Sequence, residues 1–182
     1  MFYSPVARAD GVNFGEAVGI SVDSAQLAGW NLVRQRVVGP RRDIGAAVLN
    51  APDGAAQVSL IARRFQSADV AGARMRKAVI EAHRAAFEQQ ELRTFFGRWE
   101  AKLVDGGAFA IADADGRPWR VWGGRWRADE GGVERVIHFA APDDLIDLSW
   151  VFVARLDEAD AATGREALFR TIDALKVSAA ED

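Results

Sequence analysis

Cysteine is absent from the 182 residues of the sequence. This absence excludes a disulfide framework, a thiolate nucleophile and a cysteine-ligated metal, and it leaves the redox compartment open. Histidine is also scarce, because only His83 and His138 occur. They form no His-x-x-x-His or His-Glu pair, so no metal site is expected. Either could act as a general base, but a lone histidine in a helix or strand is far more often structural.

Long apolar segments are missing as well. No apolar run approaches the roughly 20 residues that span a bilayer, so we expect no membrane insertion. The N-terminus lacks a charged segment followed by an apolar one, which predicts a cytoplasmic protein, although a chain whose leader had been removed would look the same. The length suits one domain, and 49% hydrophobic and 27% charged residues are typical of a soluble protein with a substantial core.

Motifs of common catalytic sites are lacking too. The glycines form neither a Gly-x-Gly-x-x-Gly fingerprint nor a Walker loop, and no Gly-x-Ser-x-Gly elbow occurs. The segment 113–116, Asp-Ala-Asp-Gly, matches part of a calcium loop but lacks the remaining ligands. Asp143, Asp144 and Asp147 could form an acid/base pair, yet turn formation explains such residues better. We assign no catalytic residue and no cofactor, and we favour a non-enzymatic protein.

What the sequence does contain is a series of β-prone segments between residues 99 and 156, which holds five of the six tryptophans. Turn signals rich in glycine, aspartate or proline separate the segments at 105–107, 113–116, 129–132 and 141–144. Glycine accepts positive φ at little steric cost, so such sequences favour hairpins. Consecutive strands with short connections usually pair, which predicts an antiparallel β-meander.

Alternation in the last of these segments, 145–156, predicts how the sheet is covered. By period two, one face carries the apolar side chains Ile146, Leu148, Trp150, Phe152 and Ala154. The other face carries a mixed set: Asp147, Ser149, Val151, Val153 and Arg155. This pattern predicts a sheet with one face against helices and the other partly in contact with water.

The first half of the chain predicts further strands at 18–22 and 32–38. The Pro-Asp-Gly turn at 52–54 predicts a hairpin of strands 44–50 and 55–65, because proline presets φ and glycine relaxes it. The domain organisation follows from these elements. We expect an irregular arm over 1–16, a single α+β domain over 17–178 and a tail over 179–182.

Two helices are expected to pack on the sheet. The first is predicted from Val70 to Glu91, with Ser67 or Asp69 as its N-cap. Its predicted core stripe comprises Met75, Val79, Ala82 and Ala86, widened by Ile80 and Phe87. The second is predicted over about 163–176, where Thr163 and Glu166 match a capping box. Its predicted core stripe comprises Leu168, Ile172 and Leu175.

This order of strands, long helix, β-meander and C-terminal helix resembles the PsbP/DcrB-like group of domains. The matching features are Gly29-Trp30 after an early strand, the hairpin within 46–65, the helix after it, and the closing segment 168–176. The resemblance is one of pattern and covers most of residues 18–178. It implies an α+β fold, an α/β/α sandwich of a meander sheet with a long central helix and a C-terminal helix. A START-like helix-grip fold and two small domains are the competing architectures.

The resemblance also has implications for function. The PsbP/DcrB-like group resembles a set of non-catalytic adaptors that assist photosystem assembly, occur as bacterial lipoproteins or act as chaperones for type VI secretion effectors. It therefore implies a protein-binding scaffold and argues against an enzyme. No functional residue carries over, because the group has no motif that could be matched to this sequence.

The most unusual stretch is 117–127, where four arginines and three tryptophans interleave. Such residues are enriched at protein hot spots and can also stack on nucleobases. A strand with its tryptophans in the core and its arginines in water is the favoured interpretation, ahead of a protein-binding surface. Parity places at least one tryptophan on the opposite face from the others. Nucleic acid is the least favoured ligand, because the isoelectric point is about 5.5.

Two functional hypotheses follow. The first is a non-enzymatic protein that binds another polypeptide as a bacterial adaptor, an effector chaperone or an immunity-type protein. Its candidate contact residues are Trp119, Trp122, Arg125 and Trp126. The alternative is a small-molecule-binding protein or hydrolase with a pocket between the sheet and the long helix, where His83 or His138 would matter. A free strand edge would also allow a homodimer by sheet extension.

Overall fold

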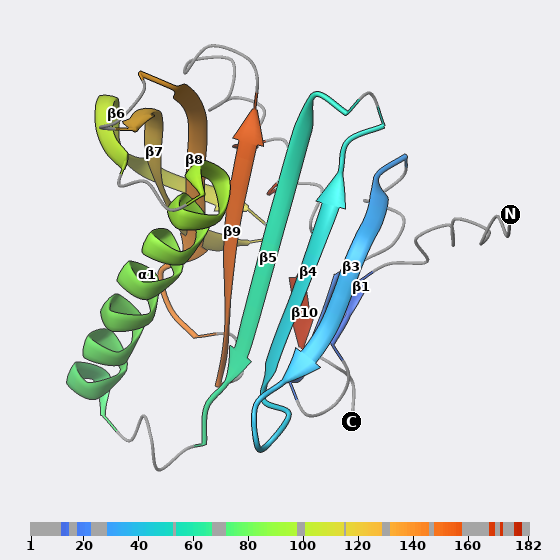
Figure 1. Cartoon of the computed structure of the whole chain (residues 1–182). Coiled ribbons are helices and arrows are strands. Elements are labelled where there is room, and N and C mark those ends of the chain that lie inside the picture. The colour runs from blue at the N-terminus through green and yellow to red at the C-terminus, as the bar shows by residue number, and fades with distance from the viewer. Residues whose placement is uncertain are drawn as a thin grey trace, which may run out of the picture.

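The computed structural model of the protein describes twelve segments of the chain. These are residues 12–14, 18–22, 29–52, 54–66, 72–97, 101–114, 116–128, 132–145, 148–157, 168–169, 172 and 177–179. Within them, strands dominate and one helix element, α1, is present (Figure 1).

A seven-stranded antiparallel sheet forms the body of the molecule. Its order is β3 (Asn31–Val38), β4 (Ile44–Asn50), β5 (Ala56–Arg64), β9 (Ser149–Asp157), β8 (Glu134–Pro142), β7 (Arg117–Ala128) and β6 (Ala101–Ala114). Strands β6 to β9 pair in sequence order, which confirms the predicted meander. The predicted hairpin at 44–65 is confirmed as β4 and β5, closed by a hydrogen bond of 2.9 Å from Ala51 N to Ala56 O.

A second, three-stranded sheet combines segments from both ends of the chain. It consists of β1 (Val12–Asn13), β2 (Ile20–Val22) and β10 (Val177–Ala179), with β2 in the centre. Two expectations are therefore corrected. Residues 12–13 form a strand within the arm expected to be irregular, and Ala179 belongs to a strand and not to a tail. Strand pairing across the whole length of the chain is not visible in local sequence.

The long helix α1 spans Ala73–Phe96, so the prediction placed it a few residues too early. Its N-cap is Gly72, whose backbone is extended and which makes no side-chain capping hydrogen bond. The proposed caps at 67 and 69 lie outside the described residues. The predicted stripe is wrong at Ala82 and Ala86, which are exposed, and confirmed at Val79, Ile80 and Phe87, which pack into the core under the helix. The helix also buries Glu91, Leu92, Phe95 and Phe96.

The second expected helix, over about 163–176, is not confirmed. Of this range only Leu168, Phe169 and Ile172 are described. Their backbone is helical, and Leu168 and Ile172 are buried against the large sheet. The other residues, with the predicted capping box, lie outside the described part of the chain. No described helix combines the length and the apolar character that crossing a bilayer requires.

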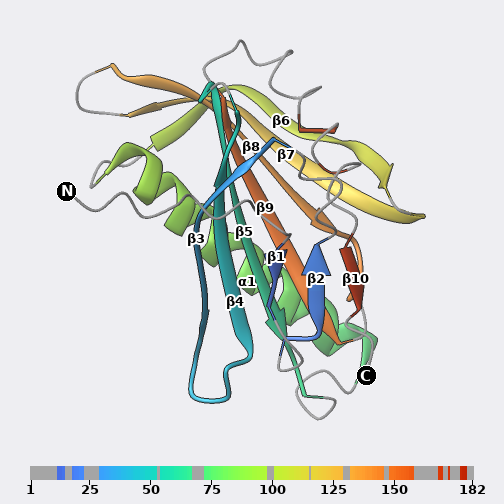
Figure 2. The ribbon, with the colours of Figure 1, turned by 90° about the vertical axis from the view of Figure 1, so that its right-hand side faces the viewer.

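The large sheet has a hydrophobic core on each face, with α1 on one side and the small sheet on the other (Figures 1 and 2). Trp150, Phe152 and Ala154 of β9 face α1, as alternation predicted. Val151 and Val153 face the small sheet and are fully buried. The expectation of one partly wet face is therefore wrong, because the chain ends supply β1, β2 and β10 to cover it.

The glycines at 106 and 107 lie inside β6 and do not form the predicted turn. Gly106 pairs with Gly124 of β7, and Gly107 pairs with Gly123. A Cβ atom on Gly106 would lie 2.2 Å from Gly123 O, so the two backbones approach more closely than side chains allow. Glycine inside a strand is typical of such close approaches, and here it permits the β6–β7 end of the sheet to curl (Figure 1).

Candidate functional site

The four predicted contact residues fall on different parts of the sheet. Trp119 is 2% exposed and belongs to the core under the small sheet, whereas Trp122 (8%) and Trp126 (6%) belong to the core under α1. This confirms that one tryptophan lies opposite the others. The side chain of Arg125 is 42% exposed and lies 3.9 Å from Glu134. The three indoles are thus parts of the two cores, and Trp122 also lines a pocket.

That pocket, of about 300 Å³, lies between the N-terminal half of α1 and the sheet. The helix contributes residues from its first three turns, and β7, β8, β9 and the turn after β8 contribute the rest. The lining residues are Arg76, Lys77, Ile80, Glu81, Arg84, Arg120, Trp122, Ala141, Pro142, Asp143, Asp144 and Trp150. A pocket between sheet and long helix is the feature that the alternative hypothesis required.

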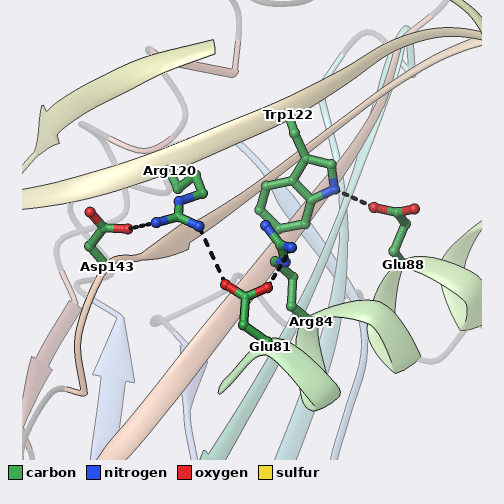
Figure 3. Close-up of polar contacts among 6 residues, drawn as sticks. All are labelled: Glu81, Arg84, Glu88, Arg120, Trp122 and Asp143. Carbon is green, nitrogen blue, oxygen red and sulfur yellow. Dashed lines mark hydrogen bonds and ion pairs between the residues drawn. The ribbon is translucent and has the colours of Figure 1, made fainter. Parts of the chain in front are cut away.

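Ion pairs connect the elements that surround the pocket (Figure 3). Arg120 of β7 lies 3.4 Å from Glu81 of α1 and 3.1 Å from Asp143 of the turn after β8. Glu81 also pairs with Arg84, one helical turn further along α1, at 2.5 Å. Arg120 therefore joins the helix to the turn, and the partly exposed side chains keep these pairs in contact with solvent.

Three contacts hold Trp122 in place. Its Nε1 donates a hydrogen bond of 2.5 Å to a Glu88 carboxylate oxygen of α1 (Figure 3). The Arg84 guanidinium lies over the ring, 5.4 Å from its centroid, in a cation–π arrangement. Phe139 of β8 stacks on the ring at 5.5 Å with an interplanar angle of 17°. The indole thus forms a rigid wall between the pocket and the core.

Neither histidine lines the pocket. His83 Nδ1 donates to Val79 O at 2.8 Å, and its Nε2 accepts from Arg63 Nη1 at 2.5 Å. His138 of β8 is fully buried in the sheet. Among the described residues, no group of three or more potential ligands is arranged to hold a metal ion. The pocket therefore offers charged and aromatic recognition groups, and the described residues of its lining include no histidine, serine, threonine or tyrosine.

Comparison with solved structures identifies the fold. The solution structure of cyanobacterial PsbP (CyanoP) from Synechocystis sp. PCC 6803 is similar to this chain with a TM-score of 0.51 and 16% sequence identity. The similarity covers 91% of this chain and 89% of that chain. The fold is PsbP-like. No protein-family model and no curated protein sequence matches the chain.

The PsbP-like fold of this chain brings together residues that sequence reasoning did not combine. Arg76, Lys77 and Glu81 were not among the candidate site residues, and Asp143 and Asp144 were interpreted as turn residues in preference to an acid/base pair. The available signal in the sequence was Ile80. Charged residues beside a large apolar helix residue indicate the rim of a helix–sheet interface. Arg120 was visible within the arginine-rich stretch, but its partners lie 39 and 23 residues away in sequence.

Proposed function

We propose that this protein is a non-enzymatic binding protein that holds another polypeptide, and that the pocket between α1 and β7–β8 is the recognition site. The observation that supports this most is the pocket itself, which combines an aromatic wall at Trp122 with charged side chains from α1, from β7 and from the turn after β8. Aromatic and arginine side chains around a concave surface are the usual anchors of protein recognition. An adaptor, an effector chaperone and an immunity-type protein would all use such a site.

The arrangement of the polar groups favours binding over catalysis. Glu81 and Asp143 are the carboxylates nearest the centre of the charge network, and both are paired with Arg120. A general acid or base needs an oxygen that is directed at a substrate. Ion pairs that hold both carboxylates against a guanidinium instead give a surface of fixed charge, which suits recognition.

The pocket also supports the alternative of a small-molecule-binding protein, because its volume of about 300 Å³ suits a small ligand. The two functions differ in what fills the pocket. A polypeptide partner would extend over the rim, whereas a small molecule would be enclosed. A homodimer through β3 or β6, the edge strands of the large sheet, and a cytoplasmic location stay predictions.

Affinity capture from the native host tests the proposal when it includes matched variants. The double variant Arg76→Ser and Lys77→Ser removes two positive charges from the pocket. The control, Arg74→Ser and Arg93→Ser, removes two exposed charges from α1 outside it. We expect the wild type and the control to retain one stoichiometric polypeptide and the pocket variant to lose it. Equal retention by all three proteins would contradict the proposed site.

Of the four residues predicted from sequence, Arg125 has the most exposed side chain, at 42%, whereas the three tryptophans are buried. Its substitution by serine therefore tests a contact at that end of β7 without disturbing a core. We propose that Trp122 acts at the pocket wall and that Trp119 and Trp126 act indirectly, by fixing the strand that carries Arg120 and Trp122.

A further inference from the structure

Two cations that line the pocket, Arg76 and Lys77, stand outside the ion-pair network of the described residues. Within the described part of the chain, neither Arg76 nor Lys77 forms an ion pair, although both line the pocket. The other two cations are engaged, since Arg84 pairs with Glu81 and Arg120 bridges Glu81 and Asp143. Unpaired positive charge at a concave surface attracts an anionic group.

Two of the three acidic side chains that line the pocket are already paired with arginines. Glu81 is held by two arginines, at 2.5 and 3.4 Å, and Asp143 lies 3.1 Å from Arg120. Glu81 and Asp143 are therefore already paired with cations. Asp144 is exposed and accepts a hydrogen bond of 2.8 Å from the Leu145 backbone N–H, and its charge leaves the described lining, with four cations and three carboxylates, positive by one. Their negative charges still disfavour a doubly charged anion, because repulsion grows with ligand charge.

Apolar surface lies beside these charges. Ile80 of α1, Ala141 and Pro142 of β8, and Trp150 of β9 line the pocket and are buried or nearly so. The only polar atom of the Trp150 ring is satisfied, because Nε1 donates to Pro142 O at 2.9 Å. The ring therefore offers the pocket a hydrocarbon surface, which favours an apolar group on the ligand.

We infer that the pocket binds a single carboxylate that carries an apolar side group, with Arg76 and Lys77 at the carboxylate and Ile80, Pro142 and Trp150 at the apolar group. This inference rests on the proposed recognition site and names the chemistry that the site takes. A polypeptide ending in an apolar residue and a free apolar carboxylic acid share this chemistry. Inorganic phosphate lacks the apolar group and carries more charge near neutral pH.

In the test, the full chain is titrated with N-acetyl-L-leucine at low ionic strength. Binding is monitored by tryptophan fluorescence and by the NMR chemical shifts of the backbone amides. N-acetyl-L-leucinamide is the matched probe that lacks the charge. We expect the acid to bind at least about tenfold more tightly than the amide, as loss of a charge-assisted contact implies. Shifts should cluster at residues 76–84, 120–122 and 141–144.

Variants assign the effect to the two cations. Arg76→Gln with Lys77→Gln should weaken binding of the acid by about tenfold or more and leave the amide unchanged. Arg74→Gln with Arg93→Gln should leave both probes unchanged. Equal binding of acid and amide, or tighter binding of inorganic phosphate, would overturn the inference. So would shifts that cluster away from the pocket.

A third probe distinguishes the two sources of the carboxylate. Acetyl-Ala-Ala-Leu with a free C-terminus should bind more tightly than N-acetyl-L-leucine if a polypeptide end occupies the site, and less tightly if a free acid does. Either order of affinity supports binding of a carboxylate, and failure of both probes to bind overturns the inference. The two experiments can fail separately. If affinity capture finds a polypeptide that binds at the pocket but none of the carboxylate probes bind, the proposed function is retained and only this inference is removed.

Discussion

The pKa of Glu91 on α1 is determined by the surroundings of its carboxyl group. Glu91 lies on the buried side of the helix, with 7% of its surface exposed. Burial raises the pKa of this carboxyl above its ordinary value, and this effect outweighs the hydrogen bond with Ser59 and the nearby charge of Arg34, which lower the pKa. The folded protein therefore binds a proton at Glu91 over a pH range in which the unfolded chain has released it.

The sign of the pH dependence follows from this difference. The contribution of Glu91 to folding is fully present below the ordinary pKa of glutamate, and it is lost as pH rises through the higher pKa of the folded state. We expect Glu91→Gln to raise the melting temperature at pH 7, because glutamine is neutral and can keep the contact with Ser59. The gain should vanish near pH 4. A variant that is less stable than the wild type at pH 7 would contradict this account.

Individual residues were predictable from the sequence where alternation alone decides their place. The opposite faces of Trp119 and Trp122 follow from strand parity, and the structure confirms them. The contact of Trp122 with Glu88 does not follow from any local pattern, because it joins β7 to a helix 34 residues earlier. Residues whose roles depend on such contacts require the packed structure.

At the scale of elements, Gly123 marks a close approach of β7 to β8. Gly123 has a φ of 113°, which side-chain-bearing residues rarely adopt, and a Cβ atom there would lie 2.4 Å from Ile137 O of β8. Backbone atoms of a central strand cannot yield as a flexible side chain can. The glycine is therefore required by both its conformation and its neighbours.

We expect Gly123→Ala to lower the free energy of unfolding by about 2 kcal/mol or more, because strain and steric overlap add. Urea denaturation followed by tryptophan fluorescence measures the change. Gly72→Ala is the control: Gly72 has a φ of −139° and open space around its Cβ position. Gly72→Ala should lower the free energy of unfolding by less than about 1 kcal/mol. Equal effects of the two substitutions would refute the role assigned to Gly123.

Elements with strong turn chemistry were predictable, and elements rich in small residues were not. The Pro-Asp-Gly hairpin appears as β4 and β5 because local chemistry alone closes it. The predicted stripe of α1 was wrong at Ala82 and Ala86 because alanine suits either face of a helix, so these residues do not indicate which side is buried. The large residues Ile80 and Phe87 mark the buried side. Gly106 and Gly107 misled in a similar way, since glycine serves both turns and strand crossings.

On the scale of the whole molecule, the two ends of the chain complete the fold. Val12 and Phe14 near the N-terminus and Leu168 and Ile172 near the C-terminus are buried on the face of the large sheet away from α1. Phe14 lies directly over Gly45 of β4, where a Cβ atom would come within 2.3 Å of its ring. Residues 12–14 therefore belong to the core and not to an independent arm.

Phe14→Ala tests this assignment. We expect the substitution to lower the free energy of unfolding by about 3 to 5 kcal/mol, as for other buried phenylalanines that leave a cavity. Val33→Ala on the exposed side of β3 is the control and should change it by less than about 0.5 kcal/mol. A Phe14→Ala protein as stable as the control would return residues 1–16 to the status of an arm.

The overall architecture was predictable to the level of an α+β, PsbP-like fold, and the pairing of distant segments was not. The meander and the early hairpin follow from neighbours in sequence. The pairing of β5 with β9, which joins the two halves of the large sheet, links residues nearly 100 positions apart. The pocket depends on that pairing as well as on α1, so its position could only be stated as an alternative beforehand.

The central claim is that a polypeptide partner binds at the pocket between α1 and β7–β8, and site-specific photo-crosslinking tests it most directly. A photoreactive residue would replace Asp144 at the pocket rim, Arg93 on the far part of α1, or Val33 on the edge strand β3, all of which are exposed. We expect the captured polypeptide to crosslink at position 144 and not at 93 or 33. Crosslinking at position 33 without crosslinking at 144 would contradict the claim and place the partner on the sheet edge.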